Sequence, residues 1–175
     1  MPSKIWTIKN KKEERFLREK TNVFEFPKYH KEVQELVKTM RETMKEANGV
    51  GLAANQIGLT MRVFVAQVPD PSGSLKFYSL FNPRIEKTGG EKLLLEEGCL
   101  SVPGVYGKVE RYERVTLSGF DKNGRSVKIK AWGLLAHVFQ HEVDHLNGVL
   151  FIDKAKELYE VSASDRIAAK NKATR

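Results

Sequence analysis

The stretch GLLAHVFQHEVDHLNG, residues 133–148, guides the interpretation of the rest of the chain. Its histidines, His137, His141 and His145, follow one another at intervals of four, which places them on one face of a helix. The apolar residues between them lie toward the back of that helix: Leu135, Val138, Phe139 and Leu146. Asn147-Gly148 is typical of a helix end. The stretch therefore predicts a helix over about 133–147 with a histidine face and a buried back.

Residues 141–145 of this helix match the pattern H-E-x-x-H. Two imidazoles one turn apart can bind one metal ion, and the carboxylate of Glu142 beside them is placed to act as a base. A catalytic site of this kind needs a third protein ligand and one open position. The extended motif with a further histidine is broken, because Phe151 stands at that position. The downstream alternatives, Glu157 and Glu160, follow closely on the helix end and are not favoured.

A better third ligand lies upstream at Cys99, the only cysteine of the chain. A lone cysteine is most often a small buried hydrophobic residue. Here Gly98 precedes it, and Ser101 and Pro103 follow, which favours a shaped loop over a core strand. One thiolate and two imidazoles would form a tetrahedral site with one position left for water.

The segment GVGLAANQIG, residues 49–58, is rich in small residues. It contains G-x-G-x-x-A, but a dinucleotide site needs a preceding strand and a βαβ unit, whereas an amphipathic helix is predicted before this segment. We therefore expect no nucleotide cofactor. Small residues let a backbone or a substrate approach closely. Gln56 adds a neutral N–H donor that is suited to an oxyanion.

The remaining sequence predicts a mixture of helices and antiparallel strands. Apolar spacing predicts a helix over 29–47 and a weaker one over 155–170, while residues 9–14 resemble a polar turn. Four segments predict strands, with a turn at 121–124 between the last two: 63–68, 75–81, 106–120 and 125–132. We expect one α+β catalytic domain over 1–175, with sheets packed around the histidine helix and helices near both ends.

Composition narrows the class of protein further. The chain has 175 residues and 41% hydrophobic residues, as in one globular domain. No apolar run reaches the length of a membrane span, and residues 1–10 lack the apolar segment of a secretory signal. A single cysteine cannot form an intramolecular disulfide, and this fits a reducing cytoplasm.

The net charge of +8 lies mainly at the ends of the chain. Residues 1–20 hold seven basic and three acidic side chains, and residues 154–175 hold six and three. Solvated termini are the simpler explanation, and attraction to a polyanion such as ribosomal RNA is the other. A nucleic-acid-binding domain is not favoured, because residues 21–153 hold seventeen basic and sixteen acidic side chains.

Three segments together resemble the peptide deformylase family, whose patterns are G-x-G-x-A-A-x-Q, E-G-C-x-S and Q-H-E-x-D-H: residues 49–56, 97–101 and 140–145. Members of that family hydrolyse the formyl group from the formyl-methionine that begins nascent chains, and they release formate. They use one divalent metal ion, commonly Fe²⁺ in the cell, with Zn²⁺, Ni²⁺ or Co²⁺ able to replace it. The resemblance covers roughly residues 5–155.

Carried over by motif, the resemblance implies three metal ligands: Cys99, His141 and His145. Glu142 would be the general acid and base for attack by a metal-bound hydroxide. Gln56 and the backbone N–H of Leu100 would stabilise the oxyanion. Asp144 is expected to be structural, with Arg111 as its partner.

The resemblance also implies where a formyl-methionyl peptide binds. The methionine side chain would enter an apolar pocket lined by three residues: Val50, Leu134 and His137. The peptide backbone would pair with strand edges beside residues 50 and 96–97, so that Glu97 belongs to the substrate site. Gly51 and Gly98 would keep the space around the formyl carbon narrow.

Other functions stay open from the sequence. One alternative is a metallopeptidase that cuts peptide bonds, and another is an inactive member that binds ribosomes or peptides. The basic C-terminal segment 155–175 is a candidate for ribosome association. The expected location is the bacterial cytoplasm, with a processed organellar chain as the alternative.

Overall fold

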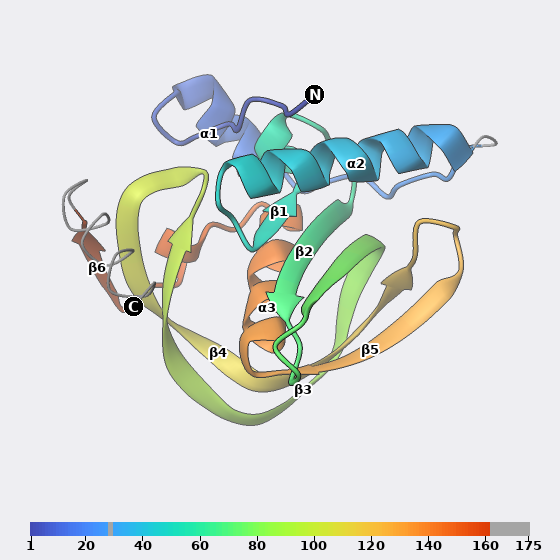
Figure 1. Cartoon of the computed structure of the whole chain (residues 1–175). Coiled ribbons are helices and arrows are strands. Elements are labelled where there is room, and N and C mark those ends of the chain that lie inside the picture. Colours follow the sequence, from blue (N-terminus) through green and yellow to red (C-terminus); the bar gives the residue numbers. More distant parts are fainter. Residues whose placement is uncertain (28–29, 162–175) are drawn as a thin grey trace.

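The computed structural model of the chain describes residues 1–27 and 30–161 (Figure 1). Its framework is one antiparallel sheet of order β1-β2-β3-β4-β5, with β6 paired to β4. The strands are β1 (Gly51–Ala53), β2 (Val63–Pro69), β3 (Leu75–Cys99), β4 (Val102–Phe120), β5 (Ser126–Trp132) and β6 (Glu157–Glu160). The long strands β3 and β4 curve around helix α3 (Gly133–Leu146), as Figure 1 shows. The expected α+β class is confirmed.

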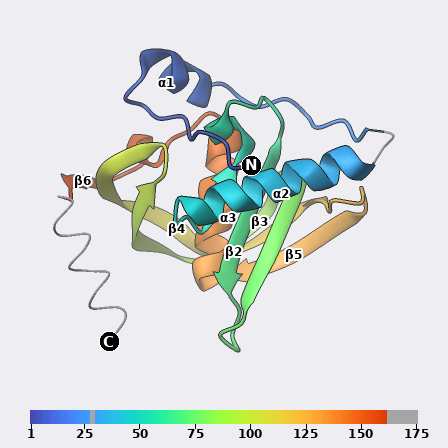
Figure 2. The same ribbon diagram turned by 45° about the horizontal axis from the view of Figure 1, so that its top comes forward.

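Strand β2 is buried on both faces, which explains its continuous apolar sequence. Successive side chains of a strand point to opposite faces. Phe64 and Ala66 therefore join the core under α3, which also contains Phe139. Val63 and Val65 join the core under α2 (His30–Glu46). Figure 2 shows α2 crossing the β2–β3 side of the sheet.

Helix α2 confirms the helix predicted over 29–47. Its buried side chains recur at helical spacing and fill the second core: Val33, Val37, Met40 and Met44. The backbone N–H of Gly49 bonds to the carbonyl of Met44 and ends the helix. The chain then enters β1, so α2 and the second core fix the position of the glycine-rich segment.

Helix α3 forms where the histidine stretch predicts it. Its apolar back is buried against the curved sheet, with Phe139 and Leu146 fully covered. The helix ends at the predicted place, where Gly148 adopts a φ of 74°. A side chain at Gly148 would also collide with the backbone of Arg18, at 2.3 Å from its carbonyl oxygen.

Residues 9–14 do not form only a turn, and this expectation was wrong. A short helix, α1 (Lys11–Leu17), begins after Asn10, whose side chain accepts from the backbone N–H groups of Lys12 and Glu13. Leu17 is fully buried and anchors the other end of α1. The N-cap Asn10 and the buried Leu17 stabilise a helix here, although the polar composition favoured a turn.

The helix predicted over 155–170 was also wrong in its described part. Residues 157–160 form β6, which pairs with Val105–Lys108 of β4, after a short 3-10 helix, η2 (Phe151–Asp153). Pairing with a strand distant in sequence overrides local helical spacing. Residues 162–170 lie outside the described part of the chain.

The strands predicted over 75–81 and 106–120 are longer than expected. Strand β3 continues to Cys99, and β4 begins at Val102, so Leu100 and Ser101 alone connect them. The pairing shifts between Gly98 and Cys99, which is an irregularity at the end of this ladder. The hairpin over 106–120 and 125–132 is confirmed. Over the described residues, no helix combines the length and the apolarity that a bilayer crossing requires.

Candidate metal centre

Three predicted ligands converge from two elements of the fold. Cys99 ends β3, and His141 and His145 lie one turn apart on α3. One ligand atom from each lies within 4.8 Å of the others, and Cys99 Sγ is 3.1 Å from His145 Nε2. The imidazole rings of the two histidines meet edge to face at 4.8 Å between centroids. One sulfur and two nitrogen donors around one point fit a divalent transition metal ion.

The electrostatics of this cluster favour the thiolate form of Cys99. Burial alone would raise the pKa of the thiol, but the charges of His145 and His141 and their hydrogen bonds outweigh burial and lower this pKa to about 5. A thiolate is the form of cysteine that binds metal ions. The cluster is therefore prepared as a ligand set at neutral pH.

A second layer of contacts is centred on Glu97, which is buried in β3. Its carboxylate accepts from His141 Nδ1 at 2.8 Å and from His137 Nε2 at 2.7 Å. Arg111 of β4 donates to both oxygens, with Nε at 2.6 Å and Nη2 at 3.0 Å. Burial raises the pKa of Glu97, but these hydrogen bonds outweigh it and hold the pKa far below its usual range. With Nδ1 of His141 engaged, its Nε2 is left for the ligand cluster.

The network continues outward to the surface. Arg111 Nη1 lies 2.5 Å from Asp144 Oδ2, which confirms the expected partnership. Lys154 then donates to Asp144 at 2.7 Å. The chain of charges joins β4, α3 and the segment after η2, so it fixes how the helix sits against the sheet. The alternative ligand Glu157 lies on β6 instead, where it pairs with Lys108 at 2.9 Å.

Glu142 lies beside the same cluster but in a different environment. It is 3% exposed, and its Oε2 atom has no hydrogen-bond partner in the described part of the chain. Burial raises the pKa of Glu142 to about 7, although the neighbouring His141 and His145 act to lower it. A carboxyl group that titrates near neutrality can both accept and donate a proton.

The glycine-rich segment passes close to the Glu142 carboxylate and leaves room for it. A Cβ atom on Gly51 would lie 2.2 Å from Glu142 Oε1, so glycine is needed where the two approach. Gln56 lies on the short 3-10 helix η1 (Ala54–Ile57) and accepts from the backbone N–H of Ala53 at 2.9 Å. Its Nε2 donates to Ser101 Oγ at 3.1 Å and approaches Cys99 Sγ at 3.5 Å. The amide N–H therefore points toward the ligand cluster.

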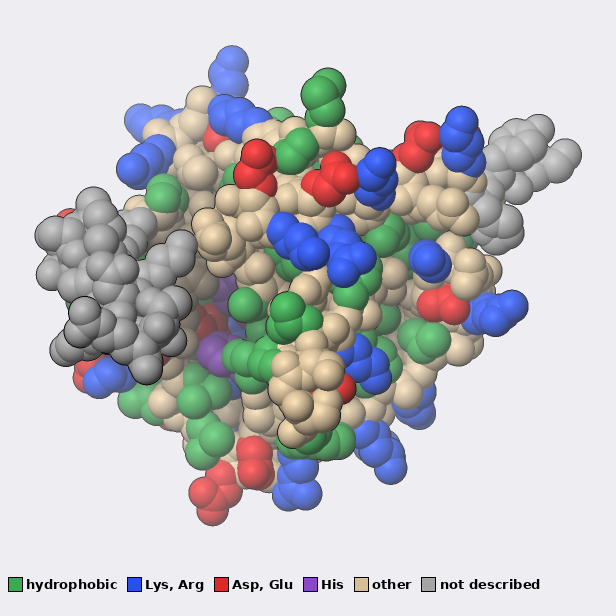
Figure 3. Space-filling view, in the orientation of Figure 1, with side chains coloured by type: hydrophobic (Ala, Val, Ile, Leu, Met, Phe, Trp, Pro, Cys, Tyr) green, Lys and Arg blue, Asp and Glu red, His purple; other side chains and the backbone are tan. Residues whose placement is uncertain are grey.

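The residues predicted for substrate binding differ in their exposure. Val50 and Leu134 are each 49% exposed, although both are apolar. In Figure 3 a histidine is visible in a hollow, with hydrophobic side chains beside it. The ring of Tyr106 covers Gly98, where a Cβ atom would lie 2.7 Å from that ring. The His137 side chain is mostly buried, and its Nε2 atom lies 2.7 Å from Glu97 Oε1.

A groove of about 1080 Å³ lies elsewhere, between α2, β3 and the β4–β5 turn. Its lining includes Lys38, Arg41 and Phe77, but none of the predicted ligands, Glu142 or Gln56. The candidate ligands converge away from this groove, at the cysteine–histidine cluster.

The sequence did not reveal three features of the site. The Glu97 side chain binds two histidines and an arginine, Ser101 holds the Gln56 amide, and Gln140 bonds to the backbone of Tyr112 at 3.0 and 2.9 Å. Ser101 and Gln140 fall inside recognised motifs, which was the available signal. Their partners are set by strand pairing and could not be read from spacing.

Comparison with known proteins agrees with this geometry. Residues 3–161 match the family model described as polypeptide deformylase. A peptide deformylase of Halothermothrix orenii is 48% identical over 130 residues, covering 74% of this chain and 82% of the relative. One of Thermodesulfovibrio yellowstonii is 46% identical over 127 residues, covering 73% and 76%.

The fold is similar to solved structures as well. A peptide deformylase of Synechococcus elongatus in complex with actinonin superposes with a TM-score of 0.78 and 39% identity, covering 89% of this chain and 80% of that one. A probable peptide deformylase of Synechococcus phage S-SSM7 gives 0.78 and 40%, covering 87% and 99%. The chain therefore belongs to the polypeptide deformylase family, whose members are metal-dependent enzymes that remove N-terminal formyl groups.

Proposed function

We propose that this chain deformylates formyl-methionyl peptides with Glu142 as the general acid and base. The observation that carries the proposal is a buried carboxyl with a pKa of about 7, placed beside one thiol and two imidazoles that converge within 4.8 Å. Cys99, His141 and His145 would hold one divalent metal ion. Such an ion, when bound, lowers the pKa of a water ligand and polarises a carbonyl oxygen.

Glu142 handles the protons in this proposal. Its carboxylate accepts the proton of the attacking water and later delivers a proton to the departing amine. The pKa near 7 suits both steps, because neither the acid nor the base form is strongly disfavoured at neutral pH. Burial keeps bulk water away from the carboxyl group and maintains this pKa.

Gln56 and the backbone N–H of Leu100 stabilise the developing oxyanion. The Gln56 amide is oriented by Ala53 and Ser101 before substrate arrives, so no reorganisation is needed. Loss of one such donor typically lowers the rate by about 10²–10³. Leu100 is next to Cys99 in the two-residue connection between β3 and β4.

The substrate side of the proposal uses the mouth of the site. Val50 and Leu134 contact the methionine side chain, and the backbone beside Gly51 and around Glu97 and Gly98 pairs with the peptide. A formyl carbon carries only hydrogen, so a narrow space above Gly51 excludes longer acyl groups. The actinonin complex of the Synechococcus elongatus relative supports a ligand site in a deformylase of this fold.

The identity of the metal ion, the domain organisation and the location of the protein are further parts of the proposal. The metal in the cell is Fe²⁺, and Zn²⁺, Ni²⁺ or Co²⁺ can take its place at a thiolate and imidazole site. We also propose that the chain acts as one catalytic domain in the cytoplasm.

Ribosome association through the basic C-terminus concerns residues that lie largely outside the described part of the chain. Pelleting with ribosomes should weaken when residues 160–175 are removed, and unchanged pelleting would contradict this association.

The proposal is tested by anaerobic incubation with a formyl-Met-Ala-Ser peptide, followed by mass spectrometry. We expect loss of the formyl group alone from the wild type and no loss with Glu142→Gln. Cleavage between residues would favour the metallopeptidase instead. An unchanged peptide, with bound metal confirmed by elemental analysis, would favour an inactive peptide-binding member.

A further inference from the structure

His137 is the third histidine of the α3 face, and the ligand cluster does not include it. Its side chain is 16% exposed and reaches inward to Glu97, whose side chain is 2% exposed. His137 Nε2 lies 2.7 Å from Glu97 Oε1, while His141 Nδ1 lies 2.8 Å from Glu97 Oε2. One buried carboxylate therefore holds two imidazoles that are four residues apart.

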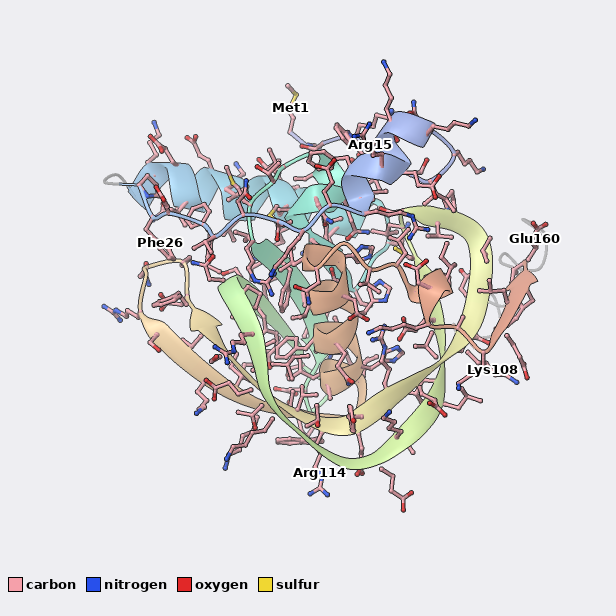
Figure 4. The ribbon with its side chains drawn as sticks, turned by 180° about the vertical axis from the view of Figure 1, so that it is seen from behind. Met1, Arg15, Phe26, Lys108, Arg114 and Glu160 are labelled. Carbon is pink, nitrogen blue, oxygen red and sulfur yellow. The ribbon has the colours of Figure 1, made fainter. Side chains whose placement is uncertain are left out.

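The two imidazoles present different nitrogens to Glu97. His141 offers Nδ1, the nitrogen next to its Cβ, and so keeps Nε2 for the ligand cluster. His137 offers Nε2, the far nitrogen, because it approaches the same carboxylate from the preceding turn. Figure 4 shows side chains filling the space between α3 and the curved β3 and β4 ribbons.

Arg111 holds Glu97 from the opposite element. Its guanidinium donates to both carboxylate oxygens from β4, whereas His137 and His141 donate from α3. Without His137, Oε1 would keep only the arginine, and the carboxylate could shift toward β4 and away from His141. A lost partner also leaves a buried acceptor poorly satisfied, which is costly.

We propose that His137 is a positioning residue for the metal centre: its N–H bond to Glu97 fixes the carboxylate that holds His141 as the Nδ1–H tautomer. This inference rests on the proposed function only in taking His141 as a metal ligand. It gives His137 a different main role from the pocket wall that the family resemblance implied. Two of the three histidines of α3, His137 and His141, are then joined through Glu97, while His145 contacts Cys99 directly.

The test compares three variants by zinc affinity, measured by competition with a chromophoric chelator. His137→Leu removes the donor and keeps much of the bulk, while His137→Gln keeps an N–H donor. Leu134→Ala is a control on the same helix for zinc affinity alone, because the Leu134 side chain cannot hydrogen-bond to Glu97 and belongs instead to the proposed methionine pocket. Removal of a direct partner of a metal-binding histidine costs about 10- to 100-fold in affinity. We expect about 3- to 10-fold weaker zinc binding for His137→Leu, since Arg111 remains, and near wild-type affinity for the other two.

A second readout is the proton NMR spectrum of the zinc-loaded protein. Slowly exchanging ring N–H signals should come from His141 Nδ1 and His137 Nε2. In His137→Leu the His141 signal should shift or broaden, and His137→Gln should largely restore it. An unchanged His141 signal together with unchanged zinc affinity would overturn the proposal. If His137→Leu does not fold, the wild type still decides, because absence of a protected His137 Nε2–H would overturn it too.

Kinetics separate the two roles of His137. A positioning role lowers kcat for a formyl-Met peptide and leaves KM nearly unchanged, whereas a pocket wall raises KM and leaves zinc affinity unchanged. The zinc and NMR readouts do not require deformylation. Failure of the proposed function would therefore be visible as an inactive wild type with intact zinc binding.

Discussion

Glu97 and Glu142 are both buried beside the same three candidate ligands, yet their surroundings are opposite. The Glu97 carboxylate receives hydrogen bonds from Arg111, His137 and His141, and its pKa is held far below the usual range. Glu142 has an oxygen without a hydrogen-bond partner among the described residues, and its pKa is raised to about 7. Both positions exclude water, so burial alone does not explain the difference.

The difference shows how two carboxyl groups in one small site can serve different purposes: one orients neighbouring side chains, and the other is suited to proton transfer. A fully paired carboxylate stays ionised and keeps its neighbours in place, which is useful for orienting ligands. An unpaired buried carboxyl exchanges its proton near neutral pH, which is useful for proton transfer. We call Glu97, Arg111 and Asp144, with their partners on β3, β4 and α3, the support region. We call Glu142 of α3 and the neighbouring Gly51 the proposed reacting region.

The largest effect is expected from breaking the support region at Arg111, which is 3% exposed. Arg111→Met leaves Glu97 and Asp144 without their shared cation, and such a loss typically destabilises a protein by about 3–5 kcal/mol. Urea unfolding of the wild type and the variant measures this. Adding Glu97→Gln to the variant should recover part of the loss. A change below about 1 kcal/mol would mean that the network is not structural.

The next effect concerns the space that Gly51 leaves for Glu142. Gly51→Ala should displace the carboxylate and lower kcat/KM about 10²-fold, because a shift of about 1 Å in a reacting group can cost that much. Zinc affinity should stay near wild type. Gly89→Ala is the matched control, since a Cβ atom there meets nothing within 4 Å. Equal activity of the two variants would contradict the assigned place of Glu142.

A pH experiment compares the carboxyl group of Glu142, the proposed acid and base, with its neutral analogue in Glu142→Gln. The folded-state pKa of Glu142, about 7, lies above its ordinary value of 4.5, so folding binds a proton between these two pH values. The stability that this proton contributes is present below about pH 4.5 and is lost as pH rises through 7. Glu142→Gln, measured with chelator present, should therefore be more stable than wild type at pH 8, by the order of 2 kcal/mol.

The direction in which the stability difference between Glu142→Gln and the wild type changes with pH tests this prediction most directly. The advantage of the glutamine variant should shrink toward zero as pH falls to about 5. Thermal unfolding at several pH values follows it directly. An advantage that stays constant with pH would mean that the carboxyl is not titrating between the folded and unfolded states.

The smallest effect is expected at the surface end of the support region. Lys154 is 42% exposed and donates to Asp144. Exposed ion pairs contribute about 0–1 kcal/mol, so Lys154→Ala should change the free energy of unfolding within that range. High salt should reduce even this change. A loss comparable to that of Arg111→Met would show that the network depends on its outer charge.

Sequence spacing predicted which side chains of α3 come together, because residues four apart in a helix lie on one face. The interval of four on α3 places His141 and His145 together in any helix, and the helix itself formed where its apolar back predicts it. The strands 63–68 and 125–132 were also found, since their patterns are short and bounded by turns. The family assignment from three motifs is confirmed by the match over residues 3–161.

Long-range pairing accounts for one of the two wrong predictions of secondary structure, and an overlooked N-cap accounts for the other. Residues 157–160 have helical spacing but join β4, and residues 9–14 are polar but contain the start of a capped helix. At 157–160 a strand partner distant in sequence decided the structure, whereas at 9–14 the local N-cap Asn10 and the buried Leu17 decided it. Local propensity carries no information about such partners.

By itself, the amino-acid sequence determined which groups are present and which of them share the face of α3. It thereby determined the family and the set of candidate metal ligands. Only the tertiary structure decided the hydrogen-bond partners, the burial and the pKa values of those groups. The curvature of β3 and β4 brings Glu97 and Arg111 to two histidines, and the close passage of Gly51 buries Glu142 without a full set of partners. A pKa depends on burial and on neighbouring charges, and both are properties of the folded chain.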